Sequence, residues 1–179
     1  MRWAITGVPG TGKTAIAAAL AGRATVIHLN DVARDAGLLT EKDEARGGAF
    51  IVDLDALADA LNERLRPETV TLIEGHYSHE MDVDAIVLLR CDPLVLIARL
   101  EQRGWSESKI RENVEVEALD VLAGEVLDSG LPAREVDTTG LAVEKAASAV
   151  WEIVEDGPEG LKGKPVGTAR WKLESLPWF

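Results

Sequence analysis

One stretch constrains the fold more than any other: GVPGTGKT, Gly7 to Thr14, which directly follows a short apolar run. It matches G-x-x-x-x-G-K-[ST], the pattern of a phosphate-binding loop between a buried strand and a helix. We therefore expect a strand at residues 2–6 and a helix from Thr14 to Leu20. The glycines allow backbone N–H groups to turn towards an anion, and the helix adds its positive end. A chance glycine-rich loop is the alternative, and the flanking strand and helix argue against it.

The residue types in this loop predict separate roles. Lys13 should reach the outer phosphates of a nucleoside triphosphate, and the Thr14 hydroxyl should hold Mg²⁺. The motif is specific for the triphosphate donor and carries no information about the acceptor.

The rest of the chain alternates between apolar runs and stretches with helical spacing. Strands are expected at residues 25–29, 69–74, 85–90 and 133–138, and helices at 54–65, 93–103 and 141–155. Asp53 and Asp92 are expected to cap two of these helices. Ser106 should begin a further helix whose apolar face comprises Ile110, Val114, Ala118, Val121 and Leu122. This alternation predicts an α/β fold with a mostly parallel sheet covered by helices on both faces.

Two stretches fall outside this pattern. Residues 30–51 are rich in charge and glycine, and we expect an irregular flap or insert there. Gly157, Pro158 and Gly160 interrupt the chain after the last helix. We therefore expect one domain over residues 1–157 and an extension over residues 158–179.

Composition sets further limits. The chain has 179 residues, of which 46% are hydrophobic and 28% are charged, as in a soluble globular domain. No apolar run approaches the roughly 20 residues that span a bilayer, and the N-terminus is interpreted as a core strand and not as a signal peptide. Cys91 is the only cysteine, which excludes an internal disulfide and suits a reducing, cytoplasmic setting. The oligomeric state is open.

A carboxylate and a histidine follow the third expected strand, in the segment LIEGHYSH. Glu74 at the strand end would serve the Mg²⁺ site or a water, as acidic residues at such positions do in P-loop proteins. His76 could orient a water or contact a phosphate oxygen. Capping of the strand end is the alternative for both residues. His76 and His79 lack the further ligands that a zinc site needs at the usual spacings.

Arg103 ends a predicted helix and precedes Gly104 and Trp105. Glycine beside a charged side chain suits a hinged lid, in which an arginine neutralises charge on a phosphoryl group during transfer. The alternative is a cation that complements the dipole at a helix end.

These segments together resemble the small P-loop family called adenylate kinase isoenzyme six, which has eukaryotic nuclear members and archaeal relatives. The resemblance rests on GVPGTGKT, NDVARDAGL, EGH and RLEQRGWSESKIRENVEVE, and it covers most of residues 1–155. It implies a P-loop fold of the nucleoside monophosphate kinase type with a five-stranded parallel sheet, an AMP-binding region near residues 30–53 and a lid near residues 102–112.

The resemblance also implies roles for individual residues. Arg103 would reach the ATP phosphates from the lid, Arg34 matches the arginine of the monophosphate region, and Glu74 and His76 match the acid and histidine linked to ATPase activity. Glu74 stands where eukaryotic members are expected to have aspartate, so the longer carboxylate could hold Mg²⁺ through water. The loop residues that would line the ATP phosphates are Gly10, Gly12, Lys13, Thr14 and Ala15.

The family resemblance implies reversible transfer from ATP to AMP to give two ADP, ATP hydrolysis, and assistance in small ribosomal subunit maturation through a ribosomal protein and pre-rRNA. One alternative is an ATPase-driven assembly factor that binds a small-subunit ribosomal protein, in which kinase activity is incidental. Another is a small-metabolite kinase on the same fold.

Charge is unevenly distributed along the chain. The net charge is −12, whereas residues 161–179 hold Lys162, Lys164, Arg170 and Lys172 against Glu174 alone. An acidic body repels nucleic acid at long range and suits a basic protein partner. In the tail, Trp171, Trp178 and Phe179 could stack on RNA, or the tail could be an ordered extension that covers an apolar patch of the body.

Overall fold

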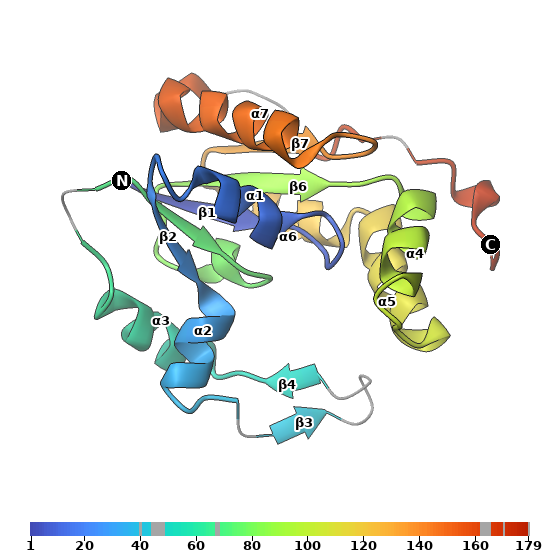
Figure 1. The fold of residues 1–179 in the computed structure, drawn as a ribbon, viewed down its shortest axis with the longest axis horizontal. Coiled ribbons are helices and arrows are strands. Elements are labelled where there is room, and N and C mark those ends of the chain that lie inside the picture. The colour runs from blue at the N-terminus through green and yellow to red at the C-terminus, as the bar shows by residue number, and fades with distance from the viewer. Residues whose placement is uncertain (40, 44–48, 67–68, 162–165, 170, 179) are drawn as a thin grey trace.

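The predicted strands form one parallel sheet in the order β2-β5-β1-β6-β7, which confirms the α/β fold (Figure 1). The computed structural model describes residues 1–39, 41–43, 49–66, 69–161, 166–169 and 171–178. The strands are β1 (Arg2–Thr6), β2 (Thr25–His28), β5 (Thr71–Glu74), β6 (Ala85–Arg90) and β7 (Ala133–Asp137). The inner strands β1, β5 and β6 are mostly apolar and buried because both faces of a parallel sheet are covered, whereas the edge strands β2 and β7 are partly polar and only partly buried.

The strand order places the carboxyl end of β1 at the position where such sheets usually bind ligands. This central strand pairs with β5 on one side, where Ile5 lies opposite Glu74, and with β6 on the other, where Ile5 lies opposite Val87. The chain winds first towards β2 and β5 and then towards β6 and β7. In such sheets, ligands bind beyond the carboxyl ends of the strands at the point where the winding reverses. The loop that follows β1 lies at this point.

Alternate strand residues point into two separate cores. Trp3 and Ile5 pack in the core beneath α1 and α7, whereas Ala4 between them packs in the core on the opposite face. Figure 1 shows α1 and α7 close together, and it shows α4 and α5 beside each other beyond the arrowhead of β6. The helices are α1 (Lys13–Leu20), α2 (Leu29–Asp35), α3 (Leu54–Asn62), α4 (Pro93–Glu101), α5 (Glu107–Ala118), α6 (Val121–Asp128) and α7 (Val143–Asp156).

The expectation of an irregular segment at residues 30–51 is wrong. Leu29, Val32 and Ala33 are buried at helical spacing and form the inner face of α2. After it, β3 (Glu41–Asp43) and β4 (Ala49–Ile51) pair as an antiparallel hairpin. Each of these strands has only three residues and is identified by its backbone pairing, so the sequence offers no long apolar run from which to predict it. Residues 40 and 44–48 of the predicted AMP-binding region lie outside the described residues.

The single helix predicted after Ser106 is also wrong, because the chain breaks between α5 and α6. Asp120 adopts a left-handed backbone with φ of 56°, which ends one helix before the next begins. Val121 is 44% exposed and so does not share the buried face of Ile110 and Leu122. Ser106 occupies the N-terminal cap position of α5 without a capping side-chain bond. The predicted caps at Asp53 and Asp92 are confirmed.

A buried arginine joins the elements around this break. Arg90 lies at the end of β6, and its guanidinium donates to Glu117 Oε1 at 2.8 Å, Asp120 Oδ1 at 2.5 Å and Glu135 Oε2 at 3.3 Å. Removing one member of a buried ion pair leaves an uncompensated charge, which is strongly destabilising. Through this network, Arg90 of β6 links three parts of the chain: α5, the α5–α6 junction and β7.

The described part of the C-terminal tail packs on the body. Leu176 is buried in the same core as α4 and α5, and the backbone N–H groups of Gly167 and Thr168 donate to Glu135. Trp171 lies 5.8 Å from the Arg90 guanidinium, and Trp178 lies beside Arg111. These contacts agree with an ordered extension that covers an apolar patch. The predicted tail residues Lys162, Lys164, Arg170 and Phe179 lie outside the described part of the chain.

Within the described ranges, the structure contains no helix with the length and apolar character needed to cross a membrane.

Candidate active site at the carboxyl edge of the sheet

The loop between β1 and α1 has the backbone that phosphate binding requires. Gly7 has φ of 149°, and a Cβ there would lie 2.6 Å from the carbonyl oxygen of Leu89. Gly12 adopts the left-handed conformation with φ of 96° directly before the first residue of α1. Only glycine fits both positions without strain. The loop can therefore direct its N–H groups and the start of α1 towards one anion.

Lys13 folds back over this loop. Its Nζ donates to the carbonyl oxygens of Gly7 at 2.7 Å and Val8 at 3.2 Å. Desolvation by burial is the main cause that lowers the pKa of Lys13 to about 8, with Glu74 opposing the shift and Arg103 adding to it. A bound phosphate would supply the negative charge that this partly buried amine lacks. Thr14 and Ala15 follow it in the exposed first turn of α1.

Glu74 connects three elements at the same edge. Its Oε1 accepts from the Thr14 hydroxyl at 3.2 Å, and its Oε2 lies 2.8 Å from Nδ1 of His28 at the end of β2. The carboxylate is nearly buried, with 6% of the residue exposed. Glu74 therefore links the end of β5 to α1 and β2.

The Thr14 and Glu74 oxygens fit a Mg²⁺ ion. Mg²⁺ takes oxygen ligands in an octahedron and usually keeps several waters beside one or two protein ligands and substrate phosphates. The two oxygens converge within one hydrogen-bond length, directly beside the loop. Among the residues that the structure describes, no group of three or more His, Cys, Asp or Glu side chains could hold a metal. Phosphate and water ligands would therefore complete the coordination.

His76 lies against the loop, as the sequence predicts. Although the residue remains exposed, desolvation of its ring and the nearby Lys13 ammonium lower its pKa, and a hydrogen bond with the backbone of Gly7 partly opposes this. The ring also packs edge-on against Tyr77, with centroids 4.9 Å apart. At neutral pH, the imidazole is therefore neutral and can accept a proton or a hydrogen bond.

The two predicted arginines differ in how they relate to the loop. Arg103 is exposed beyond α4, and its charge contributes to the lowered pKa of Lys13, which places it within electrostatic reach of the loop. Arg34 is exposed on α2 and forms an ion pair with Asp31 on the same helix. The charge of Arg103 thus acts on Lys13 of the loop, whereas Arg34 is paired on α2.

Sequence reasoning missed three residues that shape the site. His28 contacts Glu74, as described above. Arg99 of α4 donates to the carbonyl oxygens of Gly10 at 3.0 Å and Thr138 at 3.1 Å. Thr138 in turn donates to the carbonyl oxygen of Thr11 at 3.0 Å. The one available signal was the four-residue spacing of Arg99 and Arg103, which would put both on one face of the helix predicted over residues 93–103. The structure ends α4 at Glu101, so only Arg99 lies on it.

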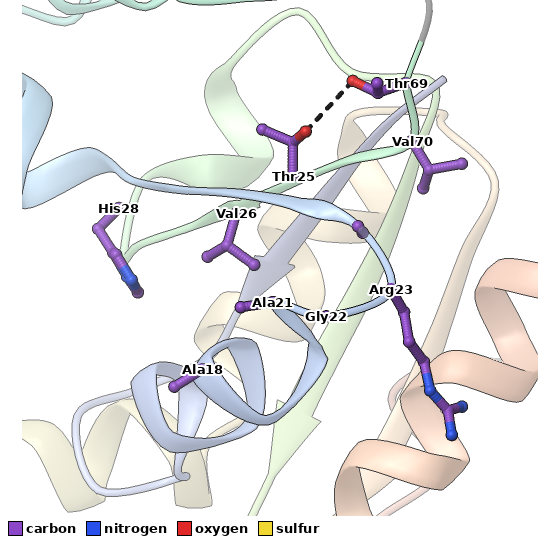
Figure 2. Close-up of a pocket in the computed structure, with 10 residues that line it drawn as sticks. Ala18, Ala21, Gly22, Arg23, Thr25, Val26, His28, Thr69 and Val70 are labelled. Carbon is purple, nitrogen blue, oxygen red and sulfur yellow. Dashed lines mark hydrogen bonds between the residues drawn. The ribbon is translucent and has the colours of Figure 1, made fainter.

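A groove of about 760 Å³ lies between the end of α1, β2 and the residues before β5, and no residue of the phosphate loop lines it (Figure 2). Figure 2 shows Arg23 at one end of it and His28 at the other, with Val26 between them. His28 is the one lining residue that also contacts the site described above. The groove is thus a feature of the sheet edge and not the phosphate site.

Comparison with known proteins identifies the family. The family described as an AAA domain matches residues 4–120. A protein of Natronomonas pharaonis named "Putative adenylate kinase" is 43% identical over 170 residues, which is 94% of this chain and 96% of that protein. Proteins with the same name from Halobacterium salinarum and Archaeoglobus fulgidus are 40% and 36% identical. These cover 91% and 96% of this chain, and 95% and 92% of their own lengths.

The matches agree with the P-loop fold and with a kinase, and they do not separate the isoenzyme six group from other adenylate kinases. The chain belongs to the AAA domain family, alongside these archaeal relatives, with a P-loop fold of the nucleoside monophosphate kinase type.

Proposed function

We propose that this protein is an adenylate kinase that uses Mg²⁺ and transfers the γ-phosphoryl group of ATP to AMP, giving two ADP. One observation carries the proposal: Lys13 and the Thr14–Glu74 pair converge at the end of β1, with the positive charge of Arg103 acting on Lys13. Phosphoryl transfer depends mainly on alignment and charge neutralisation, and this arrangement supplies both. The AMP phosphate is already an anion at neutral pH, so it needs no general base.

On the donor side, Gly10, Gly12, Lys13, Thr14 and Ala15 would surround the ATP phosphates. Thr14, and Glu74 directly or through water, would hold Mg²⁺, which neutralises phosphate charge when it is bound. Arg99 donates to the Gly10 carbonyl oxygen, which would hold this part of the loop in place while the phosphates bind. Arg103 would close over the phosphates as part of a lid near residues 102–112.

On the acceptor side, the region near residues 30–53 would bind AMP, with Arg34 contacting its phosphate. Helix α2 begins directly after His28, at the edge of the sheet where the loop also lies. Arg34 would exchange its ion pair with Asp31 for the monophosphate.

Slow ATP hydrolysis is a second activity that a specific observation favours. The neutral His76 ring lies beside Lys13 and the backbone of Gly7, where it could orient a water for attack on the γ-phosphate. Glu74 would assist through its contacts with Thr14 and His28. In this form of the proposal, water and AMP compete for the same phosphoryl group.

The role in small ribosomal subunit maturation belongs to the same proposal. The net charge of −12 suits a basic ribosomal protein as partner. The packing of Trp171 and Trp178 on the body makes their stacking on pre-rRNA a weaker hypothesis than protein binding. A pull-down of small-subunit ribosomal proteins with and without ATP tests this role. Equal, negligible capture in both states would count against it.

The kinase proposal is tested by measuring ADP formation from MgATP with and without AMP in wild type, Arg34→Ala and His76→Ala. At AMP concentrations near the wild-type KM, we expect AMP to raise turnover strongly in wild type and His76→Ala, and Arg34→Ala to lose most of this rise. Arg64→Ala is the matched control, because Arg64 is also exposed and pairs with a carboxylate of α2, Asp35. If AMP changes nothing and His76→Ala abolishes turnover, an ATPase-driven switch replaces the kinase.

A further inference from the structure

A buried hydroxyl connects the two histidines of the segment EGHYSH. Thr6, the last residue of β1, is fully buried, and its Oγ1 lies 3.1 Å from the backbone oxygen of His76 and 3.2 Å from Nδ1 of His79. His79 is buried in the short 3-10 helix η2 (Ser78–Glu80). Its Nε2 lies 3.4 Å from carboxylate oxygens of both Glu80 and Glu125. Three elements, β1, η2 and α6, therefore meet around one imidazole.

The proton count makes this arrangement bistable. A hydroxyl has one proton, so Thr6 cannot fully donate to His76 and His79 together. Two carboxylates face Nε2, so Nε2 retains its proton because a lone pair there would face two anions. When His79 is neutral, Nδ1 is consequently an acceptor and takes the Thr6 proton. When His79 is charged, Nδ1 donates to Thr6, and the Thr6 proton turns to the His76 carbonyl.

We propose that His79 is a positioning residue that sets the His76 peptide through the Thr6 hydroxyl. Protonation of His79 gives the His76 carbonyl its hydrogen bond, and deprotonation removes it. The groups that face the His79 ring are Glu80 on its own helix, Glu125 on α6, Thr6 on β1 and the nearby His76 ring. This inference deepens the proposed function, because it rests on the role given there to His76 in orienting water.

The geometry of the turn explains why one carbonyl matters. Gly75 begins the turn so close to the start of α2 that a Cβ there would lie 2.9 Å from Leu29 Cβ. The hydroxyl of Ser78 donates to the Gly75 carbonyl at 3.0 Å, which closes the turn internally. The turn is attached to β1 at two points: the Gly75 N–H donates to the Ile5 carbonyl oxygen at 3.3 Å, and the His76 carbonyl accepts from Thr6. The hydrogen bond from Thr6 determines how the His76 ring is held against Gly7.

Nuclear magnetic resonance of the full chain tests the connection directly. We expect the ¹³C shift of the His76 carbonyl to titrate with the same midpoint as the His79 ring. Thr6→Val should remove this movement, and Thr6→Ser should keep it because the hydroxyl remains. The proposal would be overturned if the ¹³C shift of the His76 carbonyl did not change with His79 titration in wild type. It would also be overturned if this change persisted in Thr6→Val.

ATP hydrolysis without AMP gives a second readout. At pH values where His79 is protonated, Thr6→Val should lower kcat about threefold to tenfold, the worth of one hydrogen bond, with the KM for ATP unchanged. The His79-linked part of the pH profile should be lost. Thr71→Val is the matched control, because Thr71 is equally buried and its hydroxyl has no hydrogen-bond partner. Loss of kcat in both variants, or in neither, contradicts the proposal.

His76→Ala separates failure of this inference from failure of the proposed hydrolysis. If His76→Ala hydrolyses ATP like wild type, the role of His76 is wrong, and the carbonyl titration alone decides whether Thr6 connects the two histidines. If His76→Ala loses hydrolysis while Thr6→Val keeps the wild-type kcat, the role of His76 stands and the positioning by His79 is wrong.

Discussion

The donor and acceptor sides of this site are held in different ways. On the donor side, Lys13 and Glu74 are partly or nearly buried and are tied by hydrogen bonds to the loop, α1 and β2. On the acceptor side, Arg34 is exposed, and the surface pair Arg64–Asp35 joins the turn after α3 to α2 at 3.0 Å. Exposed pairs contribute little to stability, whereas a buried hydrogen-bonded set is pre-organised. Donor substitutions should therefore affect turnover, and acceptor substitutions should affect AMP binding.

The largest effect is expected from Lys13→Met. Loss of the ammonium should lower kcat/KM for ATP by about a hundredfold or more, because a pre-organised charge would be lost from the phosphate loop. Steady-state kinetics measures this, and circular dichroism checks that the fold is retained. Lys145→Met, an exposed position on α7, is the control. Equal activity of both variants would show that the donor side does not depend on this amine.

Glu74→Gln should have the next largest effect. The amide keeps the size of the side chain but loses the charge that faces Thr14 and His28, so kcat should fall about tenfold to a hundredfold. The Mg²⁺ concentration needed for half-maximal rate should rise as well. Glu74→Asp, which retains the charge, should recover part of both. A Gln variant with normal Mg²⁺ dependence would remove Glu74 from the metal site.

Arg34→Ala should act on the acceptor alone. We expect the KM for AMP to rise about tenfold, the worth of one charge-assisted hydrogen bond, with the KM for ATP unchanged. Initial rates over a grid of ATP and AMP concentrations separate the two constants. An increase in both constants would mean that the two sides are not independent.

The smallest effect is expected from pH. With a pKa of about 8, Lys13 is charged below this pH and loses its proton above it. Because phosphate binds the ammonium, the affinity for MgATP should fall as pH rises, about fourfold between pH 7 and 8.5. Lys13→Arg is the control, since its guanidinium stays charged throughout. Titration calorimetry at several pH values measures this, and a constant wild-type affinity would refute it.

Local signals in the sequence were sufficient for the loop and the central strands. GVPGTGKT has its own pattern, and the strands are buried on both faces, so their residues form unbroken apolar runs. The β3–β4 hairpin and the break at Asp120 lack such a pattern. The hairpin depends on backbone pairing, and the break depends on a left-handed residue whose carboxylate pairs with the distant Arg90.

The same distinction holds for the site. Lys13, Thr14 and Glu74 belong to motifs or strand ends that sequence reading can find. His28 and Arg99 act through partners 46 and 89 residues away, so only the strand order reveals their contacts. The histidine pair connected by Thr6 is equally dependent on the pairing of β1 beside η2.

One measurement tests the central claim most directly: the fate of the γ-phosphate of ATP in the presence of AMP and Mg²⁺. With the γ-phosphate labelled, the account predicts that most of the label appears in ADP, and that it appears there only when AMP is supplied. Label found in inorganic phosphate at the same rate with and without AMP would contradict phosphoryl transfer to the monophosphate.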